Sequence, residues 1–303
     1  MSSPTAAIDL GTNTARLIIG YRDSPATIRP LLIKRAITRL GGGFTREKGI
    51  SPEAFERSLD TLRDFAHEIT KYDVSSVRAV ATSAVRDAAN GPAFCAEVLQ
   101  ETGLRLEVLN CRDEGLITLR GVLAGIDDSA GNLLVFDVGG GSTEYTLTVA
   151  RNPVFTRSLP LGVVRLTEGK KNYAAMENKV CRELQTLTSD LVPLMLSENN
   201  SQFKLVGTAG TATTLAAISL KLEDYDYRLV NNHSLSRTEI EHILSDLLPM
   251  TPAERLQVAG LERGREDLII AGIVITLKTM DLLGFTRLTV SDFGLLEGLL
   301  LTP

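Results

Sequence analysis

The spacing of apolar and polar positions predicts alternating strands and helices along the first 123 residues. Apolar residues three and four positions apart predict an amphipathic helix over 52–71, with Phe55, Leu59 and Leu62 on one face. Short apolar or alternating runs predict strands. These strands are expected at 6–8, 17–21, 31–37, 76–81 and 104–109, with a second helix at 91–102.

The same order of patterns begins again downstream. The predicted strands are 132–138, 142–150, 153–161 and 286–290, and the predicted helices are 174–197, 211–222 and 295–301. A repeated series of this kind predicts an α/β fold made of two related lobes. We expect one lobe at 1–123, completed by the closing helix at 292–303, and the other at 124–291.

One element occurs in both predicted lobes, at residues 8–14 and 136–142. Each copy is an apolar run that ends in Asp and continues into a hairpin rich in glycine and hydroxyl groups. Glycine lets backbone N–H groups turn toward an anion. Hydroxyl donors are added by Thr12, Thr14, Ser142 and Thr143. One such hairpin is an ordinary turn closed by Asp and Gly, but its recurrence at matching strand ends favours a repeated phosphate-binding loop.

The carboxylates of these two loops suggest a cation. Asp9 and Asp137 have the wrong charge to bind phosphate, so we expect them to hold Mg²⁺ (or Mn²⁺), which in turn meets phosphate oxygens. Asn13 and Glu144 lie in the same loops and are candidates for the water shell of the metal. Glu144 could equally be a solvent-facing carboxylate on a strand.

A third glycine segment, 207–211, follows a predicted strand and leads into a predicted helix. Helix N-termini attract anions, so Gly210 and Thr211 are candidate phosphate ligands. The same residues also suit a plain strand-to-helix turn with a threonine cap.

Composition narrows the function class. The 303 residues have a net charge of −5, with no basic excess and no interleaved aromatic residues, so nucleic acid is not expected as a partner. Neither a signal-peptide pattern nor a membrane-length apolar stretch is present, which predicts a cytoplasmic protein. Three scattered cysteines suit reduced thiols. A basic stretch is formed by Arg165, Lys170, Lys171, Lys179 and Arg182, and it suits either a solvated helix face or a channel for an anionic polymer.

Five segments together carry a family resemblance: 7–14, 81–88, 137–144, 207–211 and 291–294. In this order they resemble the exopolyphosphatase and guanosine pentaphosphate phosphatase (Ppx/GppA) family over nearly the whole chain, in its short two-domain form. The resemblance implies the duplicated ribonuclease H-like fold of actin-like ATPases. It also implies an active site in a cleft between the lobes, with magnesium assisting phosphoanhydride hydrolysis.

The resemblance assigns two catalytic residues. Arg86 would hold phosphate oxygens and offset charge in phosphoryl transfer, although by itself it is an arginine at a helix start on a solvated face. Glu114 would accept a proton from the attacking water. By position alone, Asp113 and Glu114 are first-turn carboxylates that suit the helix dipole. The family usually has two glutamates here, so Asp113 is a shortened partner.

The resemblance also assigns phosphate-binding and metal-binding roles to residues of the glycine loops. The resemblance implies that substrate phosphates bind at Thr12, Asn13, Thr14, Gly139, Gly140, Gly141, Ser142, Thr143, Gly210 and Thr211, and that the metal binds at Asp137, Glu144 and Asp9. The expected reaction releases orthophosphate from the end of inorganic polyphosphate. Alternatives are guanosine pentaphosphate as substrate, an actin-like ATPase or kinase, and a non-catalytic sensor of polyphosphate or nucleotide. An apolar closing helix also permits a homodimer.

Overall fold

The computed structural model describes residues 3–302 except 46, 128–130, 171 and 198–202. The chain forms two compact units. Unit 1 consists of the residues up to Ala124 together with the segment from Gly294 onward, and unit 2 runs from Gly125 to Phe293. Within the described residues, no helix has the length and apolar character needed to cross a bilayer.

Unit 1 contains a mixed sheet with the strand order β3-β2-β1-β4-β5. The strands β1 (Thr5–Leu10), β2 (Thr14–Ser24) and β3 (Thr27–Ile37) form an antiparallel meander. β4 (Ser76–Ala81) and β5 (Leu106–Val108) continue the sheet in parallel from β1. The carboxyl ends of β1, β4 and β5 therefore lie at one edge of the sheet.

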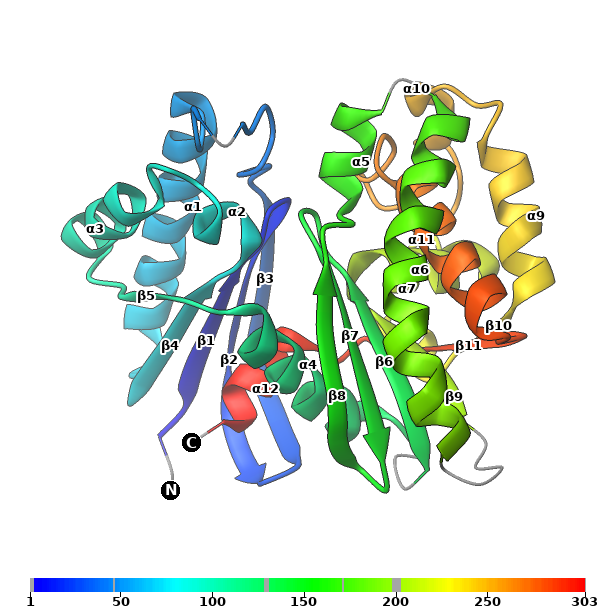
Figure 1. Ribbon diagram of the computed structural model, residues 1–303. Coiled ribbons are helices and arrows are strands. Elements are labelled where there is room, and N and C mark those ends of the chain that lie inside the picture. The colour runs from blue at the N-terminus through cyan, green and yellow to red at the C-terminus, as the bar shows by residue number, and fades with distance from the viewer. Residues whose placement is uncertain (1–2, 46, 128–130, 171, 198–202, 303) are drawn as a thin grey trace. The chain divides into compact units, whose positions relative to one another are not determined.

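Helices cover both faces of this sheet (Figure 1). α1 (Pro52–Lys71) and α3 (Gly91–Thr102) pack on one face, and α4 (Cys111–Gly125) and α12 (Leu295–Leu301) pack on the other. The short helix α2 (Ser83–Arg86) follows β4. A methyl group at Gly121 would overlap the Gly294 carbonyl, and one at Gly298 would overlap the Ile117 carbonyl. Glycines on both helices thus bring α4 and α12 to backbone contact.

Unit 2 repeats the strand pattern with the order β10-β11-β9-β6-β7-β8. Its meander is β6 (Asn132–Val138), β7 (Thr143–Val149) and β8 (Asn152–Leu159). The strands β9 (Phe203–Thr208) and β11 (Arg287–Val290) extend the sheet in parallel, and the antiparallel β10 (Ser234–Ser236) follows at the edge.

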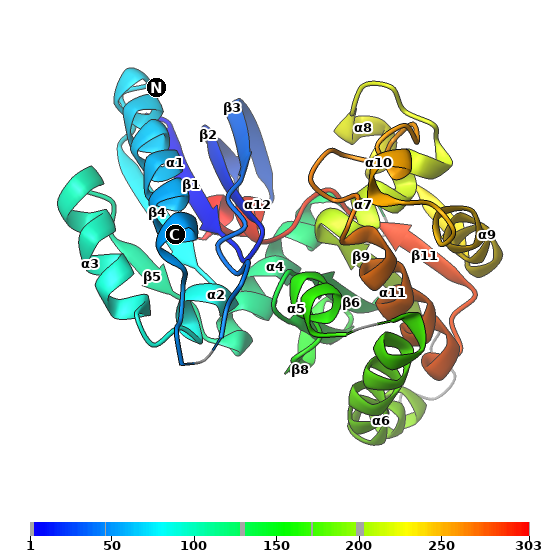
Figure 2. The same cartoon turned by 90° about the horizontal axis from the view of Figure 1, so that it is seen from above.

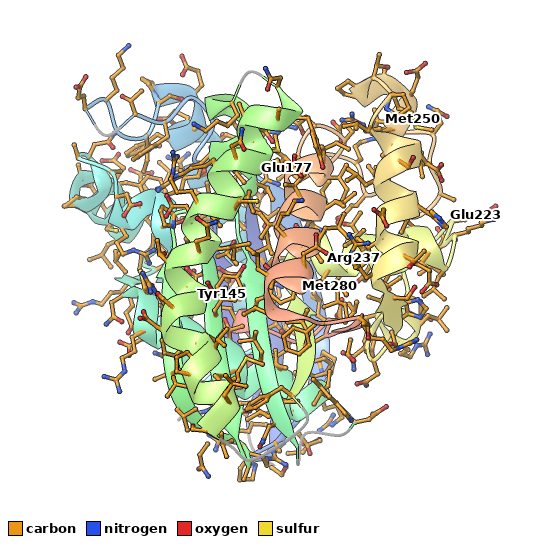
Figure 3. All side chains as sticks on the ribbon, turned by 45° about the vertical axis from the view of Figure 1, so that its right-hand side comes forward. Tyr145, Glu177, Glu223, Arg237, Met250 and Met280 are labelled. Atoms are coloured by element: carbon orange, nitrogen blue, oxygen red, sulfur yellow. The ribbon has the colours of Figure 1, made fainter. Side chains whose placement is uncertain are left out.

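The helices of unit 2 are α5 (Val163–Gly169), α6 (Tyr173–Ser197), α7 (Ala209–Ser219), α8 (Tyr227–Val230), α9 (Arg237–Leu247), α10 (Pro252–Arg255) and α11 (Ile269–Leu283). α11 packs between α6 and α9 (Figure 2). Beneath α6 and α11, the buried Tyr145 stacks on Phe136 and shares a 2.8 Å hydrogen bond with Thr279 (Figure 3). Burial raises the pKa of Tyr145, so it remains a neutral core residue.

The strand order 3-2-1-4-5 is common to both sheets, and it is the topology of the ribonuclease H-like fold. The prediction of a duplicated fold of this class is therefore confirmed. Several predicted elements, among them 52–71 and 91–102, also have the observed bounds. Between 223 and 285 the sequence patterns predict no helix or strand, and here the structure places α8, β10, α9, α10 and α11.

Candidate functional site

The first glycine hairpin joins β1 to β2 in unit 1. The N–H of Gly11 donates to the Thr14 carbonyl at 2.9 Å and closes the turn. The Asn13 carbonyl accepts from the N–H groups of the two residues after β3, Thr38 and Arg39, at 3.0 and 2.9 Å, and the Thr12 carbonyl accepts from Gly41. Carbonyl oxygens that would repel an anion are thus bonded within the protein.

The second hairpin joins β6 to β7 and repeats these bonds in unit 2. The N–H of Gly139 donates to the Ser142 carbonyl at 2.9 Å. The Gly139 carbonyl accepts from Val163, and the Gly140 carbonyl accepts from Val164 at 3.0 Å and from Arg165 at 3.3 Å. In both units, therefore, the segment that follows the third strand binds the carbonyls of the loop. This shared arrangement supports the interpretation of the two hairpins as copies of one element.

Gly162 lets α5 approach the second hairpin closely. A methyl group at this position would overlap the Gly140 carbonyl oxygen and the backbone of Gly141. We expect Gly162→Ala to destabilise unit 2 by about 1–3 kcal/mol, because backbone atoms must move to admit the methyl group, and to weaken phosphate binding. Gly169→Ala is the matched control at the other end of α5, where the methyl group meets open space. Thermal unfolding and phosphate titration of both variants test this, and equal behaviour would contradict it.

The aspartates at the two strand ends have different partners. In unit 1, Asp9 lies directly opposite Arg16 on β2, and the guanidinium of Arg16 donates to Asp9 Oδ2 at 2.8 and 3.2 Å. In unit 2, Asp137 lies directly opposite Glu144 on β7. Like charges at directly opposite positions of an antiparallel pair repel each other. The two copies therefore differ at this position: an arginine pairs with the aspartate in the first copy, and a glutamate faces the aspartate in the second.

The carboxylates of unit 2 fit magnesium. Glu144 is 3% exposed, and Asp137 is half-buried. Within the described residues no three His, Cys, Asp or Glu side chains come together at one point. Mg²⁺ needs no such cage, because one or two carboxylates commonly hold it together with substrate phosphates and water. The Asp137 and Glu144 pair thus suits this ion better than a metal with a full set of protein ligands.

The two predicted catalytic residues contact each other in unit 1. Arg86, at the end of α2, donates from Nη1 to Glu114 Oε2 and to the Leu109 carbonyl, both at 2.8 Å. Glu114 lies in the first turn of α4 and is 7% exposed. Asp113, in contrast, is exposed and bonded to Asn110. The geometry therefore separates the two neighbouring carboxylates: one faces the protein interior beside a cation, and the other faces solvent.

Two hydroxyl groups of the loops, those of Thr12 and Thr143, have structural partners. Thr12 shares a hydrogen bond of 2.9 Å with Ser83. Thr143 donates to the Leu161 carbonyl at 2.5 Å and so ties the second hairpin to the segment before α5. Asn13 differs, since its Oδ1 atom is buried and has no hydrogen-bond partner within the described part of the chain. A buried amide oxygen in this state needs a donor, and a water molecule in the loop would supply one.

The third glycine segment begins α7 two residues earlier than the predicted helix start, at Ala209, with Thr208 as the N-cap residue. Gly210 and Thr211 therefore lie in the first turn of the helix. Thr211 packs against Gly272 of α11. Beside Gly210 lies the guanidinium of Arg265, so closely that a methyl group at Gly210 would overlap it.

Arg16 and Arg265 are cationic residues whose guanidinium groups lie at these loops and that the sequence patterns did not reveal. Arg265 also donates to Glu262 at 3.0 Å, and its side chain is 14% exposed. The signal for Arg16 was present, because it stands seven residues after Asp9, the spacing that separates Glu144 from Asp137. Arg265 lies more than fifty residues from Gly210 in the sequence, and no local pattern connects them.

The basic stretch has mixed surroundings. Lys179 forms an ion pair with Glu183 one turn further along α6. Such a pair is typical of a solvated helix face. Lys171 lies outside the described residues. Whether the remaining residues follow a substrate chain stays a prediction.

A duplicated ribonuclease H-like fold with a glycine hairpin in each copy is the architecture of the actin-like ATPase class. The profile of the Ppx/GppA phosphatase family matches residues 20–302. The chain belongs to this family, and it is therefore a hydrolase of the phosphatase type.

Known proteins agree with this assignment. The chain is 32% identical over 307 residues to the bifunctional 3-dehydroquinate synthase/phosphatase of Fusobacterium nucleatum, covering 98% of this chain but only 46% of that protein, so it spans about half of that relative's length. It is 30% identical over 316 residues to exopolyphosphatase 2 of Mycobacterium tuberculosis, covering 98% and 97% of the two chains. The solved structure of the Aquifex aeolicus PPX-GPPA enzyme has 32% identity and a TM-score of 0.80, with 99% of each chain covered.

Proposed function

We propose that this protein is an exopolyphosphatase that releases orthophosphate from the end of inorganic polyphosphate. The observation that carries the proposal is the contact between Arg86 and Glu114 in a unit that also holds a glycine hairpin with its carbonyls bonded inward. The exopolyphosphatase relative of nearly equal length supports the choice of substrate. A polyphosphate end presents only oxyanions, which suits amide donors and arginines.

In the proposed reaction, water attacks the terminal phosphorus and the bond from phosphorus to the bridging oxygen breaks. Glu114 accepts a proton from the water, and the bridging oxygen remains on the shortened polymer. Arg86 holds Glu114 in place and presents N–H donors to the oxygens of the transferred group. The hairpin amides of unit 1 bind further phosphates of the polymer. No covalent intermediate is required.

Mg²⁺ is the proposed cofactor, with Asp137 and Glu144 as the residues that hold it. When bound, it would offset negative charge on the phosphate oxygens and fix their positions. We assign Asp9 a lesser part, because Arg16 already neutralises its carboxylate. Asn13, through its buried Oδ1, would accept a hydrogen bond from ordered water in the first loop.

The proposed activity can be tested by incubating the purified protein with polyphosphate, guanosine pentaphosphate or ATP in separate reactions that contain Mg²⁺. The orthophosphate released is measured over time. We expect release from polyphosphate, and release at least ~10²-fold slower from a Glu114→Gln preparation that controls for contaminating phosphatases. Faster release from guanosine pentaphosphate would transfer the proposal to that substrate. Phosphorylation of a small acceptor by ATP would indicate a kinase, and stabilisation by ligand without phosphate release would indicate a sensor.

Asp137→Asn tests the cation site. The amide removes one negative charge while keeping the shape of the side chain, so we expect the Mg²⁺ concentration for half-maximal activity to rise at least ~10-fold, the lower bound seen when even outer-shell groups are lost. Asp246→Asn, an exposed carboxylate of unit 2, is the control. An unchanged Mg²⁺ requirement in Asp137→Asn would remove this residue from the metal site.

A further inference from the structure

Each loop aspartate belongs to a row of three residues that lie directly opposite one another on neighbouring strands. We call such a row a rung of the sheet. In unit 1 the residues directly opposite one another are Asp9, Arg16 and Arg35, on β1, β2 and β3. In unit 2 the corresponding rung contains Asp137, Glu144 and Ser158, on β6, β7 and β8. Ser158 of unit 2 therefore corresponds to Arg35 of unit 1, and Glu144 corresponds to Arg16.

Ser158 contacts the buried carboxylate of this rung. Its hydroxyl donates to Glu144 Oε1 at 2.7 Å. A neutral hydroxyl restricts the orientation of a carboxylate and satisfies one oxygen lone pair, but it leaves the negative charge in place. An arginine at the same position would cancel that charge, as Arg16 does for Asp9. The serine therefore holds Glu144 without competing with a cation for it.

We propose that Ser158 is a positioning residue that holds Glu144 in the orientation required for a divalent cation. A hydroxyl at this place fixes the Glu144 side chain without adding a positive charge of its own. This inference rests on the metal site of the proposed function. It adds a residue for which the sequence patterns and the resemblance assigned no role.

Outer-shell groups that orient metal ligands have measurable effects on affinity, because their loss typically weakens metal binding 10- to 100-fold. We expect Ser158→Ala to raise the dissociation constant for Mn²⁺ by about that factor, measured by titration calorimetry or electron paramagnetic resonance without substrate. Ser158→Thr keeps the hydroxyl, and we expect it to restore affinity to within ~3-fold of the original protein.

Thr156→Ala is the matched control. Thr156 lies on the same strand and the same face as Ser158, one rung away, where it is paired with Thr146 and accepts its hydroxyl at 3.5 Å. Thr156→Ala removes one hydroxyl group from β8, as Ser158→Ala does, but leaves the hydrogen bond to Glu144 in place. We therefore expect the affinity for Mn²⁺ to stay unchanged. Melting temperatures measured without metal show that each variant is folded.

The outcomes separate this inference from the proposed function. Equal Mn²⁺ affinity in Ser158→Ala and the original protein would overturn the role of Ser158 while leaving the metal site intact. Equal losses in Ser158→Ala and Thr156→Ala would overturn it as well, since the effect would then come from the strand. If the original protein binds no Mn²⁺ at all, the metal part of the proposed function fails and this inference fails with it.

Discussion

Replacing Glu114 by glutamine should lower the turnover of polyphosphate by about 10²- to 10⁴-fold, the range that a positioned general base contributes. The amide keeps the shape of the side chain, and its oxygen can still accept the hydrogen bond from Arg86 that the carboxylate accepts at 2.8 Å. What it loses is the ability to take a proton from water. We therefore expect a fall in kcat with little change in KM.

Asp113→Asn is the control that the chain itself provides. Asp113 shares the first turn of α4, is exposed and accepts a hydrogen bond from Asn110 at 2.7 Å. If Glu114 contributes only as a negative charge at a helix N-terminus, the two variants should lose similar small amounts of stability and activity. Phosphate release at saturating polyphosphate distinguishes these cases. Full turnover in Glu114→Gln would exclude this residue as the base.

The duplication explains why the two halves need not do the same work. Their hairpins share the closing bond, and in both the loop carbonyls accept hydrogen bonds from the segment that follows the third strand. Their side chains differ at the residue opposite the aspartate, Arg16 in one and Glu144 in the other. One sequence element thus has an arginine opposite its aspartate in unit 1 and a glutamate opposite its aspartate in unit 2.

Much of the fold could be predicted because local signals were strong. Ser51 and Pro52 define the start of α1, and the hydroxyl of Ser51 does accept the N–H of Ala54. α11 was not predicted, because most of the segment Ile269–Leu283 is apolar and buried, so that its polar residues do not mark one face at a helical period. The start of α9 did carry a readable signal, the capping box of Ser236 and Glu239.

The parts of the candidate site that could be predicted are those whose residues lie together in short sequence motifs. The hairpins and their aspartates stand out as repeated motifs, and the family resemblance supplied Arg86 and Glu114. Contacts between distant residues were not predictable. The placement of Arg265 beside Gly210, and of Ser158 on Glu144, depends on strand register and on loop packing, which no local spacing encodes.

Replacing Arg86 by alanine should reduce turnover by ~10³-fold or more, comparable to the loss of an arginine that stabilises charge in phosphoryl transfer. The change removes N–H donors and also leaves Glu114, 7% exposed, without its 2.8 Å partner. Arg86→Lys keeps the charge but not the planar fork of donors, so only partial activity should return. Arg78→Ala is the control, since Arg78 pairs with Glu107 at the surface of unit 1.

The double variant Arg86→Ala with Glu114→Gln shows how the arginine acts. If Arg86 serves only to hold Glu114, the double variant should hydrolyse polyphosphate no more slowly than Glu114→Gln alone. In that case the base that Arg86 holds has already been removed by Glu114→Gln. If Arg86 also contacts the transferred phosphate, the double variant should lose a further factor of at least ~10, since charge stabilisation and proton transfer are separate contributions. We expect the second result, because a guanidinium has the planar fork of N–H donors that matches phosphate oxygens, a role distinct from holding a carboxylate in place.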